Sequence, residues 1–257
     1  MNTIDSLIPE LNSMSKYPDP LYAKGNADLL HRRKISIIGS RNPHQYALQM
    51  THQIAAALSR IGICVVSGAA MGIDAAAHRG AGSDNTIAVL PCGIDLRYPA
   101  INRSLIGDIE QKGLLLSQFE PGFHATNWSF VVRNELVVAL GEVLIVTQAD
   151  EDSGSMRSVE YALEMGKPIY ALAHRIGESS GTNRLLAEGK ARIIHDVEAF
   201  VEQFGKAESP IERNDPFMRY CASMPTYEEA AVRFRDRLFE EELKGTIEVR
   251  NGRVIVL

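Results

Sequence analysis

The sequence is poor in cysteine and lacks the spacings that usually bind metals. Cys64, Cys92 and Cys221 stand far apart among 257 residues, without a CxxC pair. Two of them lie in apolar runs, so we expect buried free thiols in a reducing cytoplasm. No His/Cys cluster, Ser-His-Asp order or pair of catalytic carboxylates stands out. We therefore expect no metal, no other cofactor and no catalytic residue.

Long apolar runs and a basic surplus are also missing. No run approaches the roughly 18 residues of a membrane-spanning helix. The first 20 residues carry early acids and no continuous apolar core, so we expect neither a signal peptide nor a membrane partner. The net charge of −5 argues mildly against a nucleic-acid coat, whose phosphate contacts need a surplus of cations. A local basic groove must therefore be argued from specific cations.

What the sequence does contain is six apolar runs that alternate with helical patterns. The runs are continuously apolar, which fits strands covered on both faces. No GxGxxG follows the first run and no GxxxxGK[ST] occurs, so dinucleotide and P-loop sites lose their main support. The alternation predicts an α/β fold with a doubly wound, mostly parallel sheet. The predicted strands are 35–39, 63–68, 86–91, 113–118, 142–148 and 168–173.

The composition changes near residue 205. The segment GKAESPIERNDP is polar and holds two prolines, as linkers do. Further on, short helical patterns precede Asn251-Gly252, which lies between two alternating runs and is a strong hairpin signal. Short helices before a hairpin are typical of a winged helix. The predicted organisation is an extension at 1–30, a main domain at 31–204, a linker at 205–215 and a winged-helix-like domain at 216–257.

Small residues and hydroxyls follow three of the predicted strands. Glycine lets a backbone approach a ligand, and free amides at a helix N-terminus favour an anion. Serine and arginine add donors that suit phosphate. Because the carboxyl ends of parallel strands share one edge, the loops together predict a phosphate pocket, although each alone could be an ordinary turn. They contain Gly39, Ser40 and Arg41; Ser67 and Gly68; and Ser153, Gly154 and Ser155.

Two further groups have a functional and a structural interpretation. Trp128 and Phe130 precede Arg133 and Asn134 at the start of a helix, which suits base stacking beside phosphate binding in a single strand. Both rings could instead pack in the core, and for Trp128 we favour the core. Asp74 and His78 could form an acid–base pair, but we favour a local hydrogen bond that braces the turn.

Seven segments, in order, resemble the DprA (Smf) family of DNA-processing proteins. They cover roughly residues 17–200 and are IIGSRNPHQYA, VVSGAAMGIDAAAHRGA, TIAVLPCGIDLRYPAINRSL, GLLLSQFEPG, FVVRN, ADEDSGSMRSVEYALEMGKPIYAL and SGTNRLLAEGKA. The resemblance implies an extended Rossmann-like domain in a cytoplasmic protein, commonly a homodimer. It also implies binding and protection of single-stranded DNA and loading of the recombinase RecA on it during natural transformation.

The resemblance also implies which residues contact DNA. One departure is Glu135, which replaces a cation and puts a basic contact in doubt. His174 and Arg175 replace a proline-glycine pair and could restore positive charge. The implied DNA-binding residues are Arg41 of the Gly-Ser-Arg motif, the loop at Ser67 and Gly68, Phe130, Arg133 and Asn134, and the segment Ser153 to Ser155.

Two other classes of function stay open beside a non-enzymatic single-strand binder that mediates recombination. One is a phosphoribohydrolase-type enzyme acting on nucleoside monophosphates, in which Glu160 would be the catalytic acid. The chain lacks the Pro-Gly-Gly that precedes this acid in such enzymes. The other is a pure protein-interaction role, carried by residues 206–257.

Overall fold

The computed structural model describes residues 2–4, 6–205, 216–221, 223–243, 246–250 and 252–256. The chain divides into two compact units, Met1–Gly205 and Lys206–Leu257. Residues 206–215, which make up nearly all of the expected linker, lie outside the described residues.

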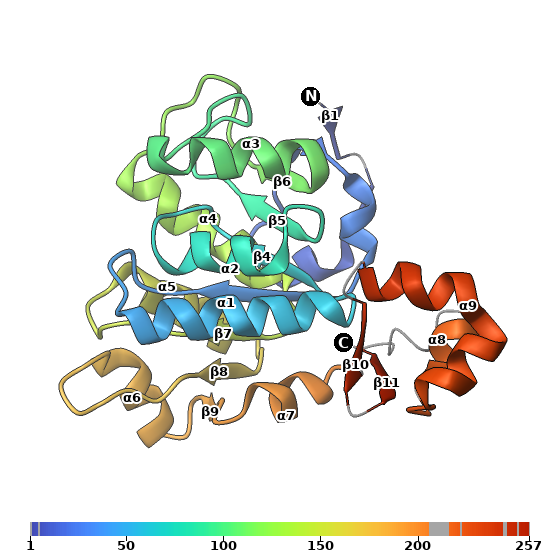
Figure 1. Ribbon diagram of the computed structural model, residues 1–257. Coiled ribbons are helices and arrows are strands. Elements are labelled where there is room, and N and C mark those ends of the chain that lie inside the picture. Colours follow the sequence, from blue (N-terminus) through green and yellow to red (C-terminus); the bar gives the residue numbers. More distant parts are fainter. Residues whose placement is uncertain are drawn as a thin grey trace. The chain divides into compact units, whose positions relative to one another are not determined.

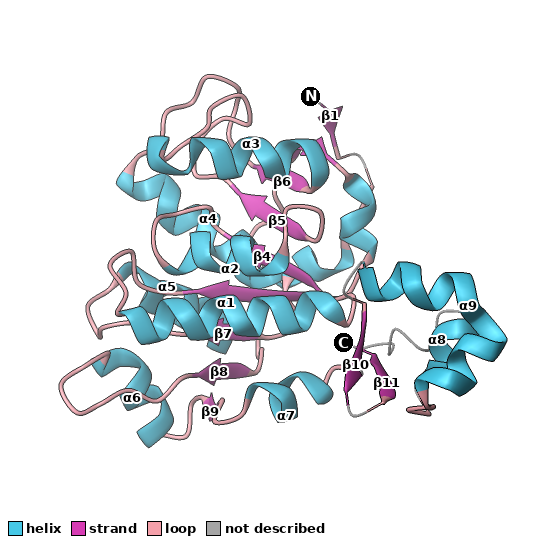
Figure 2. Cartoon of the chain, viewed as in Figure 1, coloured by secondary structure: helices cyan, strands magenta, loops and turns pink. Residues whose placement is uncertain are grey.

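A sheet of nine strands runs through the first unit (Figure 1; Figure 2), in the order β1-β2-β6-β5-β4-β3-β7-β8-β9. Across the sheet, from β6 through β5, β4, β3, β7 and β8 to β9, each strand is parallel to the next. β2 pairs antiparallel with β6, and β1 with β2. The predicted mostly parallel, doubly wound sheet is therefore confirmed. The strands are β1 Asn2–Thr3, β2 Tyr22–Gly25, β3 Lys34–Ile38, β4 Cys64–Ser67, β5 Thr86–Val89, β6 Leu114–Ser117, β7 Leu144–Val146, β8 Ile169–Ala171 and β9 Arg192–Ile193.

Helices cover both faces of this sheet. Ile35 and Ile37 of β3 pack with α1 and α2, whereas Ile38 belongs to the core formed with α4 and α5. Each such side chain stabilises the fold by about 1.5–3 kcal/mol, which explains why the strand sequences are continuously apolar. The helices are α1 Gln45–Arg60, α2 Ile73–Ala81, α3 Arg103–Lys112, α4 Asn127–Leu140, α5 Gly154–Glu164, α6 Ser180–Ala187 and α7 Val197–Glu202, with short 3₁₀ helices η1 Pro9–Ser13, η2 Ala27–His31 and η3 Ala100–Asn102.

The expected N-terminal extension is part of the domain rather than an appendage. It contributes β1 and β2 to the sheet, and Leu11 and Leu29 of its 3₁₀ helices are fully buried in the core shared with α4. Asn26 caps η2 in this segment, because its side chain accepts a hydrogen bond from the Asp28 amide at the start of that helix.

The order of the strands creates a switch point at β3. The chain passes from β3 outward through β4, β5 and β6, and α4 then carries it back to β7 on the other side of β3. A crevice opens outside the carboxyl ends of the two strands where the winding reverses. In this fold that position lies beyond β3 and β7, where α1 and α5 begin.

The second unit has its own small core. The described part of this unit consists of α8 Pro216–Cys221, α9 Tyr227–Leu243 and the antiparallel hairpin β10 Ile247–Arg250 with β11 Arg253–Val256. Phe217 and Leu238 are buried within this core. The predicted hairpin is confirmed, with Gly252 at a φ of 75° that favours glycine, while Asn251 lies outside the described residues. The winged-helix assignment stays a prediction.

The structure can be compared with the sequence expectations about membrane-spanning helices and about the cysteines. Among the described residues, no helix combines the length and the apolar character needed to cross a membrane. Cys64, Cys92 and Cys221 are all buried, as predicted. Burial raises the pKa of Cys64 to about 12, so this thiol stays protonated at neutral pH.

Candidate functional site

A cavity of about 380 Å³ occupies the crevice beyond β3 and β7. It brings together the β3–α1 loop, one side of α4 and the start of α5, which lie far apart in the sequence. The predicted site residues in its wall are Gly39, Ser40, Arg41, Phe130, Arg133, Asn134, Ser153, Gly154 and Ser155, and the other lining residues are Ile38, Asn42, Ala70, Asp74, Asn127, Val131 and Ser158.

The β3–α1 loop is held rigidly at the cavity. The Ser40 amide donates to the Gln148 carbonyl at 2.8 Å, and the Asn42 amide donates to Ser40 Oγ at 3.1 Å. Ser40 Oγ therefore keeps its own proton to donate to a ligand. A Cβ at Gly39 would lie 2.8 Å from the Gln148 carbonyl oxygen. Glycine is thus required there for packing against β7, whereas the sequence had suggested that it keeps the turn open to a ligand.

Arg41 lies over an aromatic ring at the rim of the cavity. Its guanidinium carbon is 4.5 Å from the centroid of the Phe130 ring, and the side chain is exposed. Such a cation–π contact contributes about 0.5–1 kcal/mol at an exposed site. The contact holds a cation and a flat ring side by side, one suited to phosphate and the other to a base.

Arg133 lies at the bottom of the cavity and is only 3% exposed. It comes from the second turn of α4, near the helix start where the sequence placed it. Its Nη1 donates to the Val89 carbonyl at 2.7 Å and to the Gly68 carbonyl. Its Nε has no hydrogen-bond partner among the residues that the structure describes. A buried unpaired donor costs about 1–3 kcal/mol, so an oxygen atom of a ligand would be well placed here.

Asp74 is buried beside Arg133 and moderates its charge. Burial raises the pKa of Asp74, and the Arg133 charge opposes that rise. Burial lowers the pKa of Arg133 to about 10, against the effect of Asp74. Arg133 is therefore still cationic at neutral pH, but a neighbouring carboxyl offsets part of its field. Arg41 is the more available cation of the two.

Asp74 and His78 brace the loop that follows β4. Asp74 Oδ2 accepts from the Gly68 and Ala70 amides at 3.1 and 3.3 Å, and His78 Nε2 accepts from the Ala69 amide at 3.3 Å. The predicted brace is present, although it consists of separate bonds rather than one between the two side chains. Burial lowers the pKa of His78 to about 3, so the ring stays neutral and able to accept.

Ser67 and Gly68 do not line the cavity, which corrects the expectation that they contact a ligand. Ser67 is fully buried, and its Oγ donates to the Ile37 carbonyl at 2.7 Å. A Cβ on Gly68 would lie 2.0 Å from Arg133 Nη1. Both residues lie behind the cavity floor. Ser67 ties the end of β4 to β3, and the missing side chain of Gly68 leaves the space that the Arg133 guanidinium fills.

The start of α5 offers hydrogen-bond donors to the cavity. Ser153 is the N-cap residue, but its side chain makes no capping bond, and its Oγ is buried without a partner. No acidic residue occupies the first turn. The amides of Gly154 and Ser155 have no acceptor within the helix, and the positive end of the helix dipole favours an anion.

Trp128 neither packs in the core nor lines the cavity. It is 62% exposed, and its ring meets Phe119 edge-on at 5.9 Å. Our preference for core packing was therefore wrong. Trp128 lies in the first turn of α4, before the helix reaches the sheet, so no layer covers its ring.

Three charged positions raised by the sequence lie away from the cavity wall. Glu135 is buried and accepts from the Ser15 amide at 2.7 Å, so the replaced cation would not have faced the cavity. Glu160 is exposed, pairs with Arg157 at 2.5 Å and is not among the residues that line the cavity. His174 Nε2 lies 2.7 Å from the Thr147 carbonyl, so its ring braces β7.

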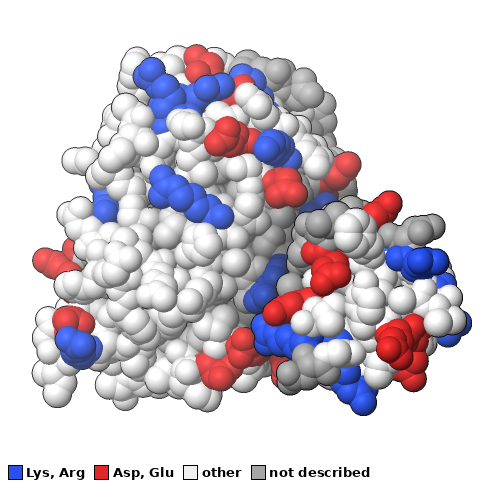
Figure 3. Space-filling view, in the orientation of Figure 1, with Lys and Arg blue, Asp and Glu red and all other residues white. Residues whose placement is uncertain are grey.

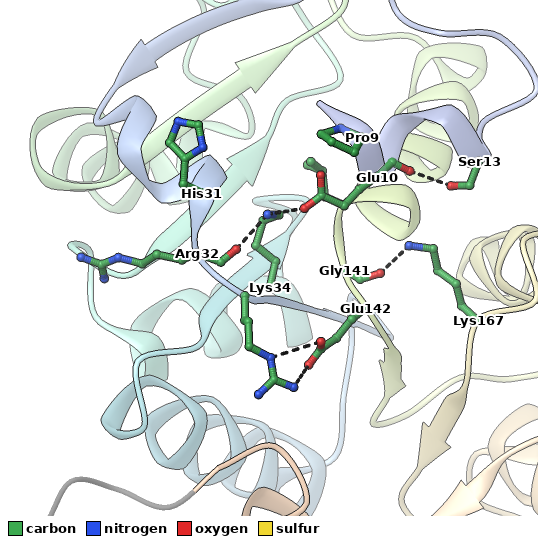
Figure 4. Close-up of a pocket in the computed structure, with 11 residues that line it drawn as sticks. Pro9, Glu10, Ser13, His31, Arg32, Lys34, Gly141, Glu142 and Lys167 are labelled. Carbon is green, nitrogen blue, oxygen red and sulfur yellow. Dashed lines mark hydrogen bonds and ion pairs between the residues drawn. The ribbon is translucent and has the colours of Figure 1, made fainter. Parts of the chain in front are cut away.

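A larger cavity, of about 550 Å³, lies near the amino end of β3. Figure 4 shows Lys34 pointing at Glu10 and at the Arg32 carbonyl, and Lys167 pointing at the Gly141 carbonyl, whereas the Arg32 side chain points away from these residues. Lys34 Nζ donates to the Leu30 and Arg32 carbonyls at 2.7 and 2.8 Å and pairs with Glu10 at 2.6 Å. This ammonium has used all three donors.

The Lys167 ammonium of this larger cavity also donates to backbone carbonyls. Its Nζ donates to the Ala139 carbonyl at 2.6 Å and the Gly141 carbonyl at 2.5 Å, at the end of α4. Burial lowers the pKa of Lys167 to about 8. Arg33 pairs with Glu142 at 2.8 Å. The cations here cap a helix and join the N-terminal segment to the domain, so the smaller cavity is the better candidate for a ligand.

The face of the first unit drawn in Figure 3 shows no broad basic patch among the described residues. On the face of the first unit that Figure 3 shows, basic and acidic side chains are interspersed, and much of the surface over α1 is uncharged. A ligand that is bound by this domain would therefore be held by specific contacts rather than by a broad positive field.

Sequence reasoning missed several residues of the cavity wall. Asn127 lies three residues before Phe130, and Ser158 lies three after Ser155. Helical spacing could have found both, because residues three or four apart share a helix face. Nothing in the sequence pointed to Gln148, whose carbonyl and side chain hold the β3–α1 loop.

Comparison with known proteins identifies similar chains. Residues 4–205 match the family model described as DNA recombination-mediator protein A. The DNA processing protein DprA of Bacillus subtilis is 32% identical over 212 residues, which are 80% of this chain and 70% of that protein.

Solved structures agree with this match. The structure of DNA processing protein A from Helicobacter pylori superposes with a TM-score of 0.77 at 38% identity, covering 79% of this chain and 94% of that one. It is described in terms of the single-stranded DNA binding mode of that protein. DprA from Streptococcus pneumoniae superposes with a TM-score of 0.71 at 32% identity, covering 76% of this chain and 70% of that one.

Proposed function

The chain belongs to the DNA recombination-mediator protein A family, also called DprA or Smf, and we propose that it binds single-stranded DNA through the cavity beyond β3 and β7. The observation that carries the proposal is the grouping of unpaired donors beside a flat ring. Arg133 Nε and Ser153 Oγ are buried without partners, and Arg41 lies over Phe130 at the rim.

The donors suit a backbone phosphate. Arg41 supplies a guanidinium, which binds phosphate through paired, charge-assisted hydrogen bonds. Ser40 Oγ adds a hydroxyl proton, and the first amides of α5 add a positive helix end. The Phe130 ring offers a surface for a base. Phosphate contacts with base stacking are the means by which proteins hold single strands without reading sequence.

The alternative of a phosphoribohydrolase-type enzyme has less support. It needs a carboxylate acting in the cavity, and Glu160 is paired with Arg157 outside it. Asp74 does line the cavity, but its Oδ2 accepts two backbone amides and braces the loop. We therefore propose a binding protein without catalysis.

The wider role follows the family. We propose that the protein acts in the cytoplasm, protects incoming single strands and loads the recombinase RecA on them during natural transformation. We also propose that it works as a homodimer. The description of the Helicobacter pylori protein as a binder of single-stranded DNA supports the first step of this role.

A binding titration with single-stranded and duplex oligonucleotides across a salt series tests the proposal. A small cavity that clamps phosphates and stacks bases admits a flexible strand and not a paired one, so single strands should bind at least tenfold more tightly. The affinity should fall with salt, because binding releases counterions. Equal affinity for duplex, or no salt dependence, would count against the proposal.

A further inference from the structure

Tyr98 forms a second aromatic surface beside the cavity. Its ring lies 6.0 Å from the Phe130 ring and is tilted by 58° to it. Phe130 in turn carries the Arg41 guanidinium at 4.5 Å. The three side chains thus form a continuous row that leads out of the cavity, and Tyr98, at its outer end, is 45% exposed.

The segment that carries Tyr98 is fixed to the loop behind the cavity. Asn102 Nδ2 donates to the Ala69 and Ala70 carbonyls at 3.0 and 2.9 Å, and Ala70 lines the cavity. The exposed Tyr98 ring therefore has a held position beside the cavity wall.

The charges on the two sides of the cavity differ. Arg103 is exposed at the start of α3, directly after this segment. Asp95, the acid closest in sequence to Tyr98, is occupied in accepting from the Gly122 amide at 2.9 and 3.1 Å. On the opposite side, the acids before α5 are partly engaged, because Glu151 pairs with Arg184 at 2.6 Å and Asp150 accepts from the Ser180 amide at 3.3 Å. Arg103 is thus a cation that a phosphate leaving the cavity on the Tyr98 side would meet.

We propose that the bound strand leaves the cavity across Tyr98, which stacks a second base, and that Arg103 contacts the phosphate beyond it. This rests on the proposed function and adds two residues that are neither among the expected DNA-binding residues nor in the cavity wall. The row of Phe130 and Tyr98 provides successive stacking surfaces, as single-strand binders do.

The test compares a thymidine oligonucleotide with an abasic strand of the same length. Stacking needs a base, whereas phosphate binding does not. Tyr98→Ala should weaken binding of the thymidine strand by about five- to tenfold and leave the abasic strand unchanged. Tyr98→Phe should bind like wild type. Arg103→Ala should weaken both strands and lower the salt slope by about 0.7. Trp128→Ala, which removes a still more exposed ring outside the row, is the matched control and should change neither.

A double-mutant cycle separates direct stacking from support of Phe130. If Tyr98 carries its own base, Tyr98→Ala should still weaken the thymidine strand when Phe130→Ala is present. The proposal is overturned if that second loss vanishes, if Tyr98→Ala affects both strands equally, or if it affects neither. Failure of the cavity itself would show separately, as wild-type affinity of Arg41→Ala for the abasic strand.

Discussion

At the scale of residues, the two arginines of the site have different tasks because their burial differs. Arg133 has given its Nη1 to two backbone carbonyls and stands beside Asp74, so part of its charge is already used inside the protein. Arg41 is exposed and rests on Phe130. We therefore expect Arg41 to dominate phosphate affinity and Arg133 to hold the shape of the cavity floor.

The sequence could place these side chains at one sheet edge but not assign their partners. Arg41, Phe130 and Arg133 were all expected at the site, and all line the cavity. Ser67 was expected there too, yet it donates to the Ile37 carbonyl inside the sheet. Strand-end position fixes the end of the sheet at which a residue lies. Whether its hydroxyl faces a ligand or a neighbouring strand depends on tertiary packing, which a motif does not encode.

At the scale of elements, the β3–α1 loop, one side of α4 and the start of α5 lie together because the switch in strand order places them at one point. The six predicted strands could be recognised because continuous apolar runs signal burial on both faces. β1, β2 and β9 were missed. None of them lies in a continuously apolar run, because β1 reads NT, β2 reads YAKG and both residues of β9 are exposed.

The anion-binding role of α5 can be tested at Gly154. This residue is exposed in the first turn, and a Cβ there would meet no atom within 4 Å. Gly154→Asp should raise the melting temperature by a few degrees, since a carboxylate at a helix N-terminus is stabilising by about 0.3–1 kcal/mol. It should weaken single-strand binding by about tenfold or more, because the same carboxylate repels phosphate.

Gly154→Ala is the control for this change. It should also stabilise the helix, through propensity, while binding DNA like wild type. A Gly154→Asp protein that keeps wild-type affinity would show that the start of α5 does not face a phosphate.

At the scale of the whole molecule, a single cavity of this size makes few phosphate contacts, and the net charge of −5 adds no general attraction. A homodimer would offset this weakness, because two cavities on one strand raise the effective concentration for the second contact. Light scattering at tens of micromolar (roughly the range of weak dimers) should give twice the mass of the chain. The dimer would be contradicted if light scattering gave the mass of one chain while the protein still bound long strands much more tightly than short ones.

The most direct test of the central claim is the affinity of Arg41→Ala for single-stranded DNA, measured beside its melting temperature. Hydrogen bonds to charged groups are worth about 1.5–3 kcal/mol, so the loss should be about ten- to a hundredfold. Arg41→Lys should restore only part of it, because an ammonium lacks the fork of a guanidinium. The melting temperature should fall by no more than a few degrees, because the side chain faces solvent and loses only its contact with Phe130. An Arg41→Ala protein that melts like wild type and binds single strands equally well would contradict the assignment of the cavity.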